Sequence, residues 1–76
     1  MTNITLPILA EGVDKASVSY WFKQVGDTVK KDEDLVELVT DKATFNMPSP
    51  VAGTVKKILV SEGDSAKVGQ EIAVIE

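Results

Sequence analysis

The chain has 76 residues, which is enough for one domain with a small hydrophobic core. It contains no Cys and no His, which excludes disulfides, zinc–thiolate sites, thiol nucleophiles and catalysis by the most common general base. Its formal net charge of −4 is spread along the sequence, which argues against nucleic acid and anionic membranes and favours a partner with a basic surface.

The sequence shows no feature of a membrane segment or of a signal peptide. No apolar run approaches the roughly 20 residues that span a bilayer. Met1–Ile4 has neither a basic region nor a long apolar stretch. We therefore expect no membrane among the partners of this domain.

Val and Ile recur at short spacing between Gly, Pro and Asp, a pattern typical of an all-β chain. Pro48-Ser49-Pro50 is expected to end a strand, because proline has no N–H to donate to a ladder. Short strands without a helical period predict an antiparallel sandwich or barrel. In chain order, the predicted elements are a strand over Ile4–Leu6, a loop over Ile8–Lys15, and strands over Ala16–Phe22, at Val29, over Leu35–Val39, from after Ala43 to Met47, over Gly53–Val60, near Ala66 and over Glu71–Ile75.

The chain also contains an internal repeat. A shift of 37 residues places Asp14–Val39 on Val51–Glu76 without a gap, and the apolar, turn and charged classes agree at nearly every informative position. The turn residues Gly26-Asp27 fall on Gly63-Asp64. Asp32 falls on Gly69, which suggests a left-handed backbone that Asp tolerates better than most residues. Two similar halves, neither of which can cover its own apolar face, predict a pseudo-two-fold sandwich.

Both copies break the strict alternation of strand residues at one place. With strict alternation, Val18 and Trp21 would lie on opposite faces of their strand, and so would Val55 and Ile58. A β-bulge between the members of each pair would bring both side chains inward.

A polar hairpin lies between the two copies. Thr40–Thr44 separates two apolar runs, and we expect the Asp41 carboxylate to accept a backbone hydrogen bond in the turn. Lys42 would then stand at the tip with its amine in water. Under the pseudo-two-fold, this tip and the chain ends should lie at opposite poles. Such a layout suits a carrier domain better than an enzyme, which needs a concave pocket.

Several short motifs stand at characteristic distances along the chain. Asp-Lys-Ala alone is a weak signal, but its combination with a proline-rich turn and with glycine turns on both sides is specific. The motifs are Leu6-Pro7, Glu11-Gly12, Val25-Gly26-Asp27, Thr40-Asp41-Lys42-Ala43, Pro48-Ser49-Pro50-Val51-Ala52-Gly53 and Glu62-Gly63-Asp64.

Together these motifs resemble the lipoyl domains of the acyltransferase (E2) chains in 2-oxo acid dehydrogenase complexes, and the resemblance covers residues 1–76. It implies a flattened barrel of two four-stranded antiparallel sheets, a barrel-sandwich hybrid with pseudo-two-fold symmetry. It also implies that Lys42 is an N6-lipoyllysine, which a lipoate ligase or lipoyl transferase forms by joining lipoic acid to its amine through an amide.

The resemblance further implies a swinging-arm carrier without catalysis of its own. Its arm would take an acyl group from the decarboxylase (E1), deliver it to the E2 catalytic core for transfer to CoA, and be reoxidised by dihydrolipoamide dehydrogenase (E3). Asp41 and Ala43 beside the lysine, and Glu11 and Gly12 in the Ile8–Lys15 loop, are the expected recognition residues.

The loop departs from the family pattern, because Ile8 and Ala10 stand where the family often has an acidic residue and a glycine. This departure leaves the cognate complex open. The isolated domain is expected to be a monomer, cytoplasmic in a bacterium or in the mitochondrial matrix of a eukaryote.

Other side chains are given simpler interpretations. Asp32-Glu33-Asp34 lacks the glycine and the distal Glu of a helix–loop–helix calcium site, so a solvated turn and no metal are expected. We predict no catalytic residue. The aromatic residues Trp21, Phe22 and Phe45 are expected in the core, and Asn46 is expected to face water.

Three other functions compete with the lipoyl carrier. A biotinyl carrier domain would share the fold, but that family typically has methionine on both sides of its lysine, where this chain has Asp41 and Ala43. An unmodified interaction module could keep the same fold. An enzyme that acts alone is disfavoured by the lack of His and Cys.

Overall fold

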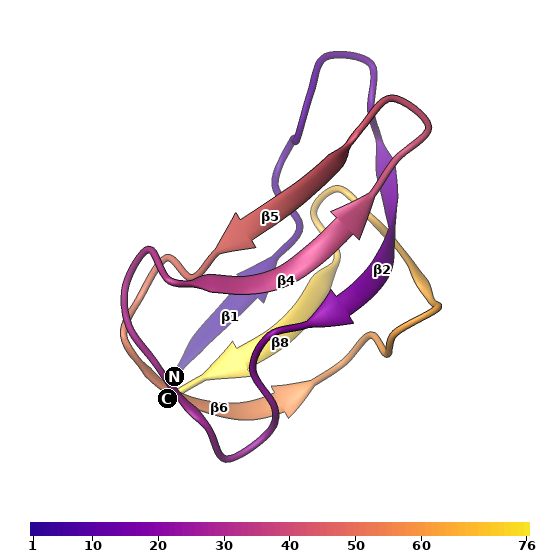
Figure 1. Cartoon of the computed structure of the whole chain (residues 1–76). Helices are drawn as coiled ribbons and strands as arrows, with labels where there is room; N and C mark the ends of the chain where they lie inside the picture. The colour runs from indigo at the N-terminus through magenta and orange to yellow at the C-terminus, as the bar shows by residue number, and fades with distance from the viewer.

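The computed structural model describes all residues from Met1 to Glu76 as an all-β sandwich. One sheet has the strand order β1-β8-β6-β3 and the other the order β5-β4-β2-β7 (Figure 1). Every strand pair is antiparallel. The predicted fold of two four-stranded sheets is therefore confirmed, and the chain has no helix that could cross a bilayer. The strands are β1 (Thr2–Thr5), β2 (Lys15–Trp21), β3 (Thr28–Val29), β4 (Asp34–Val39), β5 (Thr44–Pro48), β6 (Gly53–Ile58), β7 (Ser65–Lys67) and β8 (Glu71–Ile75).

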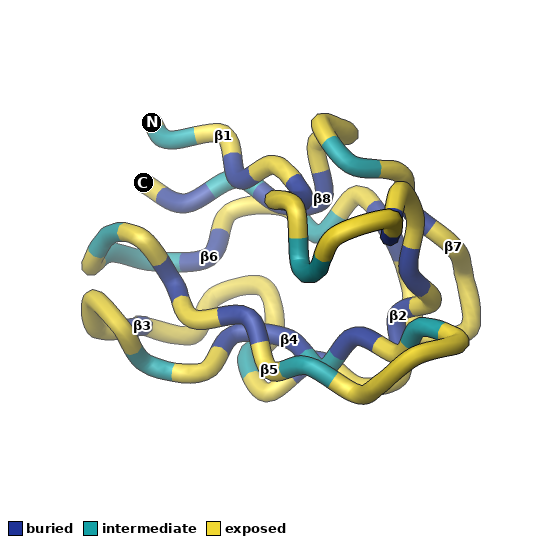
Figure 2. Tube along the Cα trace, turned by 90° about the horizontal axis from the view of Figure 1, so that it is seen from above, coloured by how far each residue is buried: buried dark blue, intermediate teal, exposed yellow.

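The core lies between the two sheets and is contributed by both. Figure 2 shows buried positions along the strands of both layers and mostly exposed positions in the turns around them. The molecule measures 31 × 20 × 17 Å along its principal axes, so it is elongated in one direction. The side chains at the centre are Ile4, Leu6, Val18, Leu35, Val36, Leu38, Val55, Ile72 and Ile75.

The two sheets are related by the pseudo-two-fold that the repeat predicted. The shift of 37 residues carries β2, β3 and β4 onto β6, β7 and β8. The outer strands β5 and β1 follow the same symmetry with a shift of 43, because Met47 pairs with Val36 as Ile4 pairs with Ala73. The two sheets are thus equivalent, and each takes its short edge strand, β3 or β7, from the half that supplies the main strands of the other sheet.

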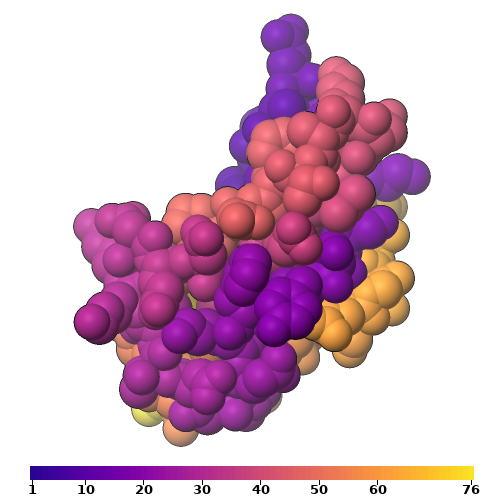
Figure 3. All heavy atoms as spheres, in the orientation of Figure 1, coloured from indigo at the N-terminus to yellow at the C-terminus, as the bar shows by residue number.

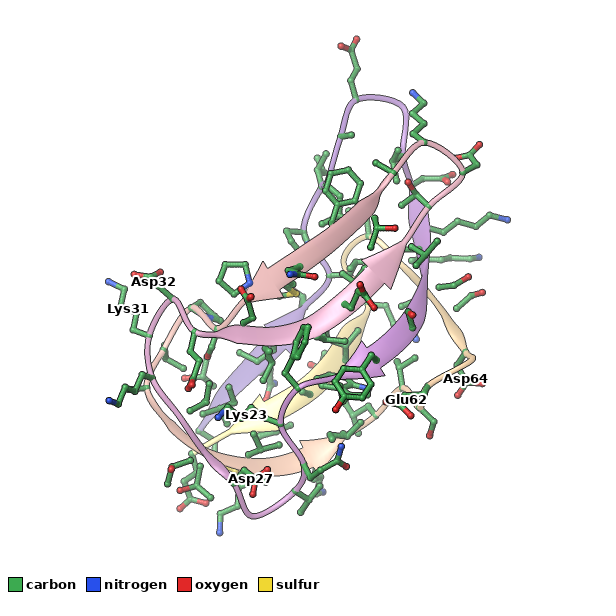
Figure 4. The ribbon with its side chains drawn as sticks, viewed as in Figure 1. Lys23, Asp27, Lys31, Asp32, Glu62 and Asp64 are labelled. Carbon is green, nitrogen blue, oxygen red and sulfur yellow. The ribbon has the colours of Figure 1, made fainter.

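Equivalent turns tie the halves together. Gly26 donates to Val55 O at 2.8 Å, and Gly63 donates to Val18 O at the same distance. Val55 and Val18 donate back to the carbonyls of Asp27 and Asp64 at 2.9 and 2.7 Å. Figure 4 labels these two aspartates at their separate turns. Since each turn bonds to the opposite half, neither half is complete alone.

The predicted bulges are present in both halves. The register of β2 against β4 shifts between Val18 and Tyr20, and that of β6 against β8 shifts between Val55 and Lys57. Val18 and Trp21 are consequently both buried. The Trp21 indole donates from Nε1 to Val60 O at 2.8 Å, so its polar atom is satisfied inside the core.

The expectation that Phe22 lies in the core is wrong. Because the bulge turns Trp21 inward, the next residue points out, and Phe22 is 40% exposed. Its ring packs edge-on against Tyr20, with centroids 5.2 Å apart. Phe45 is only half-buried, whereas Asn46 is exposed as predicted.

Several strand boundaries also differ from the predictions. β1 spans Thr2–Thr5 rather than Ile4–Leu6, and β2 spans Lys15–Trp21 rather than Ala16–Phe22. Pro48 is the last residue of β5 and pairs with Asp34, which is possible because β5 is an outer strand whose final N–H is not required. β6 ends at Ile58 rather than Val60, although Leu59 still donates its N–H to Ile72 O of the neighbouring β8 at 2.8 Å.

The two poles of the molecule are distinct. The N- and C-termini lie side by side at one end, and the β4–β5 hairpin lies at the other, beside the loop that connects β1 to β2 (Figure 1). The predicted separation of the hairpin tip from the chain ends is confirmed. The candidate functional residues all belong to the hairpin pole.

Candidate functional site

The hairpin between β4 and β5 is a tight turn over residues 40–43. Its backbone is closed by a hydrogen bond from Thr40 N to Ala43 O at 2.9 Å. The Thr40 hydroxyl accepts from Lys42 N at 3.2 Å and from Ala43 N at 3.1 Å. It also donates to Ala43 O at 3.0 Å. One side chain therefore organises the whole tip, in the manner of a Ser/Thr turn.

The prediction that Asp41 would stabilise this turn is wrong. The first turn position belongs to Thr40, and the Asp41 carboxylate makes no hydrogen bond within the turn. Thr40 was missed because the hydrogen-bonding side chain of the turn was expected one residue later, at Asp41. Asp41, Lys42 and Ala43 are all exposed and follow one another along the tip.

Lys42 does not simply extend into water. Its Nζ donates to the main-chain carbonyl of Glu11 at 2.9 Å, a contact between residues 31 positions apart. Figure 3 shows the loop and the hairpin side by side at the top of the molecule, in purple and pink. The structure thus brings together Lys42 and the loop residues Glu11 and Gly12 that the sequence singled out.

The loop is anchored at its base and open at its tip. Leu9 packs against the core and Val13 is buried, while Glu11 and Gly12 are exposed. A turn from Val13 N to Ala10 O at 3.1 Å shapes the tip. Leu6 N also donates to Gln70 O at 3.0 Å, which ties the start of the loop to the segment before β8. These contacts fix where the Glu11 carbonyl points.

Gly12 has a specific reason to be glycine. Its φ angle is +81°, which side chains disfavour, and a Cβ at this position would lie 3.2 Å from Lys42 Nζ. The absence of a side chain leaves room for the lysine amine to reach the neighbouring carbonyl.

A polar depression opens beside the tip, with a volume of about 340 Å³. Asp14, Lys15, Asp41 and Ser65 line it, together with the Gly12 backbone and Thr40. It contains no pair of groups suited to nucleophilic catalysis, and no cluster of three metal-ligating side chains exists anywhere in the chain. The chemistry that this pole offers is an exposed primary amine on a rigid turn, to which a group can be attached.

Comparison with known families gives a match over nearly the whole chain. The family model described as "Biotin-requiring enzyme", which covers biotin and lipoyl attachment, matches residues 2–75. The match includes both sheets and the hairpin pole.

Two curated bacterial proteins illustrate the sequence similarity. Over 75 residues the chain is 47% identical to the dihydrolipoyllysine-residue succinyltransferase component of the 2-oxoglutarate dehydrogenase complex of Bartonella vinsonii subsp. berkhoffii, covering 99% of this chain and 18% of that protein. Over 72 residues it is 47% identical to the dihydrolipoyllysine-residue acetyltransferase component of the pyruvate dehydrogenase complex of Corynebacterium glutamicum, covering 95% of this chain and 11% of that protein. The chain therefore spans less than a fifth of the length of these relatives.

Two solved structures have a similar fold. The lipoyl domain of the 2-oxoglutarate dehydrogenase complex from Azotobacter vinelandii superposes with a TM-score of 0.79 at 28% identity, covering 100% of this chain and 96% of that one. The urea carboxylase of Kluyveromyces lactis gives a TM-score of 0.65 at 26% identity, covering 100% of this chain but 8% of that one.

Proposed function

The chain belongs to the family of biotin- and lipoyl-attachment domains, and from that premise we propose that it is a lipoyl carrier domain with lipoic acid joined to Lys42. The observation that carries this proposal is the exposed Lys42 at the tip of the β4–β5 hairpin, at the pole opposite the chain ends. The domain has no catalytic role of its own. It presents a covalently held group to enzymes that act on that group.

The residues around Lys42 fit such an attachment. Asp41 and Ala43 have short side chains, and all three residues are exposed, so a modifying enzyme can reach the amine. The Thr40 hydroxyl holds the turn from inside without covering the tip. When bound, the dithiolane of lipoic acid supplies the acyl-carrying and redox chemistry, which this chain without Cys or His cannot supply itself.

Lipoate is favoured over biotin for two reasons. The similar proteins with 47% identity are named for a dihydrolipoyllysine residue, and the match to the lipoyl-domain structure covers the whole of this chain. The lysine here also lies between Asp41 and Ala43, without the flanking methionines typical of biotinyl domains. The similarity to urea carboxylase concerns the shared fold.

The proposed partners follow from the same relatives. The arm on Lys42 receives an acyl group at E1, passes it to the E2 catalytic core, and is reoxidised by E3. A lipoate ligase or lipoyl transferase acts earlier on the unmodified amine. Glu11, Gly12, Asp41 and Ala43 form the surface that these enzymes meet, and the isolated domain is a monomer. The arm carries acyl groups in the cytoplasm of a bacterium or in the mitochondrial matrix of a eukaryote.

Intact-mass measurement after incubation with a lipoate ligase, ATP and lipoate tests the proposal. We expect a gain of one lipoyl group, which Lys42→Arg abolishes and Lys15→Arg, at another exposed lysine of the same pole, does not. The modified domain should then be reductively acylated by an E1. Uptake of biotin with a biotin ligase, but not of lipoate, would favour the biotinyl carrier. No uptake of either, together with full complex activity of Lys42→Arg, would favour an unmodified interaction module.

A further inference from the structure

The hydrogen bond between Lys42 and the β1–β2 loop has a geometry that can orient the lysine amine. Nζ lies 2.9 Å from the Glu11 carbonyl oxygen, within the range of a well-formed N–H···O bond. The acceptor is a main-chain atom, so its place is fixed by the loop rather than by a flexible side chain. Leu9 and Val13 hold that loop against the body of the domain.

A hydrogen bond of this kind orients a lysine that is about to react. A neutral amine has two N–H groups and one lone pair. If one N–H points at the Glu11 carbonyl, which lies on the protein side, rotation about the last side-chain bond is restricted and the lone pair is turned away from the loop. The amine is then presented in few orientations, which reduces the entropic cost of reaching the reactive geometry.

We propose that the Glu11 carbonyl and the bare Cα of Gly12 form a positioning element that aims the Lys42 amine for modification. The inference rests on the proposed function and adds a specific part to it. Glu11 contributes through its main chain, and Gly12 contributes by lacking the Cβ that would crowd Nζ at 3.2 Å. The hairpin thus supplies the lysine, and a segment 31 residues away sets the direction of its reactive atom.

The reaction that this element assists is an acyl transfer from an activated lipoate, an acyl adenylate held by the modifying enzyme. A bond forms between Nζ and the acyl carbon. The bond between that carbon and the adenylate oxygen breaks, and the adenylate leaves with the electron pair. One Nζ proton passes to a base of the modifying enzyme. The other N–H stays on the product, so the amide keeps one donor for the Glu11 carbonyl, and the root of the arm remains fixed after modification.

The main test compares glycines that share a strained backbone but differ in their surroundings. Gly12 and Gly63 have φ angles of +81° and +92°, but a Cβ on Gly63 would meet nothing within 4 Å. We expect Gly12→Ala to slow the modification of Lys42 by the ligase about fivefold, because the amine must move off the carbonyl. Gly63→Ala should lose similar stability and be modified at the rate of the unchanged chain.

A second variant at Gly12 separates backbone strain from the contact with the amine. Asn tolerates the left-handed region better than Ala does, yet carries the same Cβ. Gly12→Asn should therefore lose less thermal stability than Gly12→Ala and slow modification to the same extent. Modification that follows thermal stability across Gly12→Ala, Gly12→Asn and Gly63→Ala would overturn the proposal.

A spectroscopic measurement tests the contact without any ligase. The Glu11 carbonyl and the Gly12 N–H belong to one peptide group, so the Gly12 amide nitrogen reports on hydrogen bonding to that carbonyl. We expect Lys42→Met to shift this resonance clearly. Lys31→Met, a change at an exposed turn lysine labelled in Figure 4, should leave it in place.

The outcomes separate this inference from the proposed function. If the unchanged chain takes up no lipoate, the proposed function fails, whatever the Gly12 resonance does. If the unchanged chain is modified but Gly12→Ala is modified equally fast, or if Lys42→Met leaves the Gly12 resonance unshifted, the positioning role alone fails.

Discussion

Asp32 and Gly69 stand 37 residues apart and share a left-handed backbone, with φ angles of 70° and 89°. Each donates its N–H at 2.8 Å to the segment that follows an outer strand, Asp32 to Ser49 O and Gly69 to Leu6 O. The two halves therefore build the same turn from different residues. Asp32 bears a steric cost that Gly69 avoids.

We expect Asp32→Gly to stabilise the domain by about 0.5–1 kcal/mol, because it removes that cost where the backbone is already left-handed. For a chain of this size the melting temperature should rise by roughly 2–8 °C. Thermal unfolding followed by circular dichroism measures the change. The reciprocal variant Gly69→Asp should lower the melting temperature. A fall with Asp32→Gly would mean that the carboxylate contributes an interaction that outweighs the strain.

A second pair of equivalent residues predicts a pH effect. Glu33 accepts from Lys30 N at 2.9 Å and pairs with Lys23 Nζ at 3.2 Å, and these contacts, the backbone hydrogen bond first, hold the pKa of Glu33 below its ordinary value of 4.5. A carboxyl whose pKa is lowered in the folded state stabilises the fold above its unfolded pKa, and this contribution is lost as the pH falls through the folded pKa. Gln70 makes the equivalent hydrogen bond, from Lys67 N at 3.0 Å.

Glu33→Gln should therefore preserve the turn, and its stability should decrease less than that of the unchanged chain as the pH falls below about 4.5. Gln70→Glu should do the opposite and steepen it, because it adds a carboxylate that accepts the same backbone bond. Melting temperatures measured from neutral pH to about pH 2 would show both changes. Parallel curves for all three proteins would mean that other carboxyl groups dominate the acid response.

The hydrogen bonds of the turn predict that Thr40 stabilises it and that Asp41 does not. Thr40→Val keeps the shape of the side chain but removes all hydrogen bonds of the hydroxyl, so we expect a loss of about 1 kcal/mol and slower modification of Lys42. Asp41→Asn should change stability by less than about 0.5 kcal/mol. Urea denaturation measures both. The reverse order of effects would restore the carboxylate as the stabiliser of the turn.

Trp21 is expected to be the most sensitive aromatic position. Trp21→Phe leaves a cavity and removes the donor to the Val60 carbonyl in the core, which should cost about 2–4 kcal/mol. Phe22→Leu, on the exposed face of the next position, should cost less than about 1 kcal/mol. Urea unfolding followed by far-ultraviolet circular dichroism compares the two. Equal losses would place Phe22 in the core after all.

The repeat explains why so much of the fold could be predicted from the sequence. Because each half supplies the other's missing face, a single comparison of the halves gave the paired sheets, the bulges at Val18–Trp21 and Val55–Ile58, and the left-handed Asp32. The polarity of the molecule followed from the position of the hairpin between the copies.

The features that could not be predicted depend on single-residue offsets or on tertiary contacts. The assignment of the turn to Asp41 rather than Thr40 placed the first turn position one residue too late, although the end of β4 at Val39 was predicted correctly. The side chain of Phe22 points outward because of its position relative to the β-bulge in β2, and the sequence pattern did not define that position to a single residue. The contact between Lys42 and Glu11 joins segments 31 positions apart, so no local pattern predicts it.

The pairing of the first and last strands has a topological consequence. Thr2 faces Ile75 across β1 and β8 as Phe45 faces Leu38 across β5 and β4, so the chain ends occupy the place that the lysine hairpin occupies in the other half. If the chain ends were joined, the backbone would form a closed ring with two equivalent hairpins, one between β4 and β5 and one between β8 and β1. A circular permutant, closed by a short turn between Glu76 and Met1 and opened at the β5–β6 connection, should keep every strand pairing. Grafting Thr40–Ala43 into that new turn would give one domain a lysine hairpin at each pole.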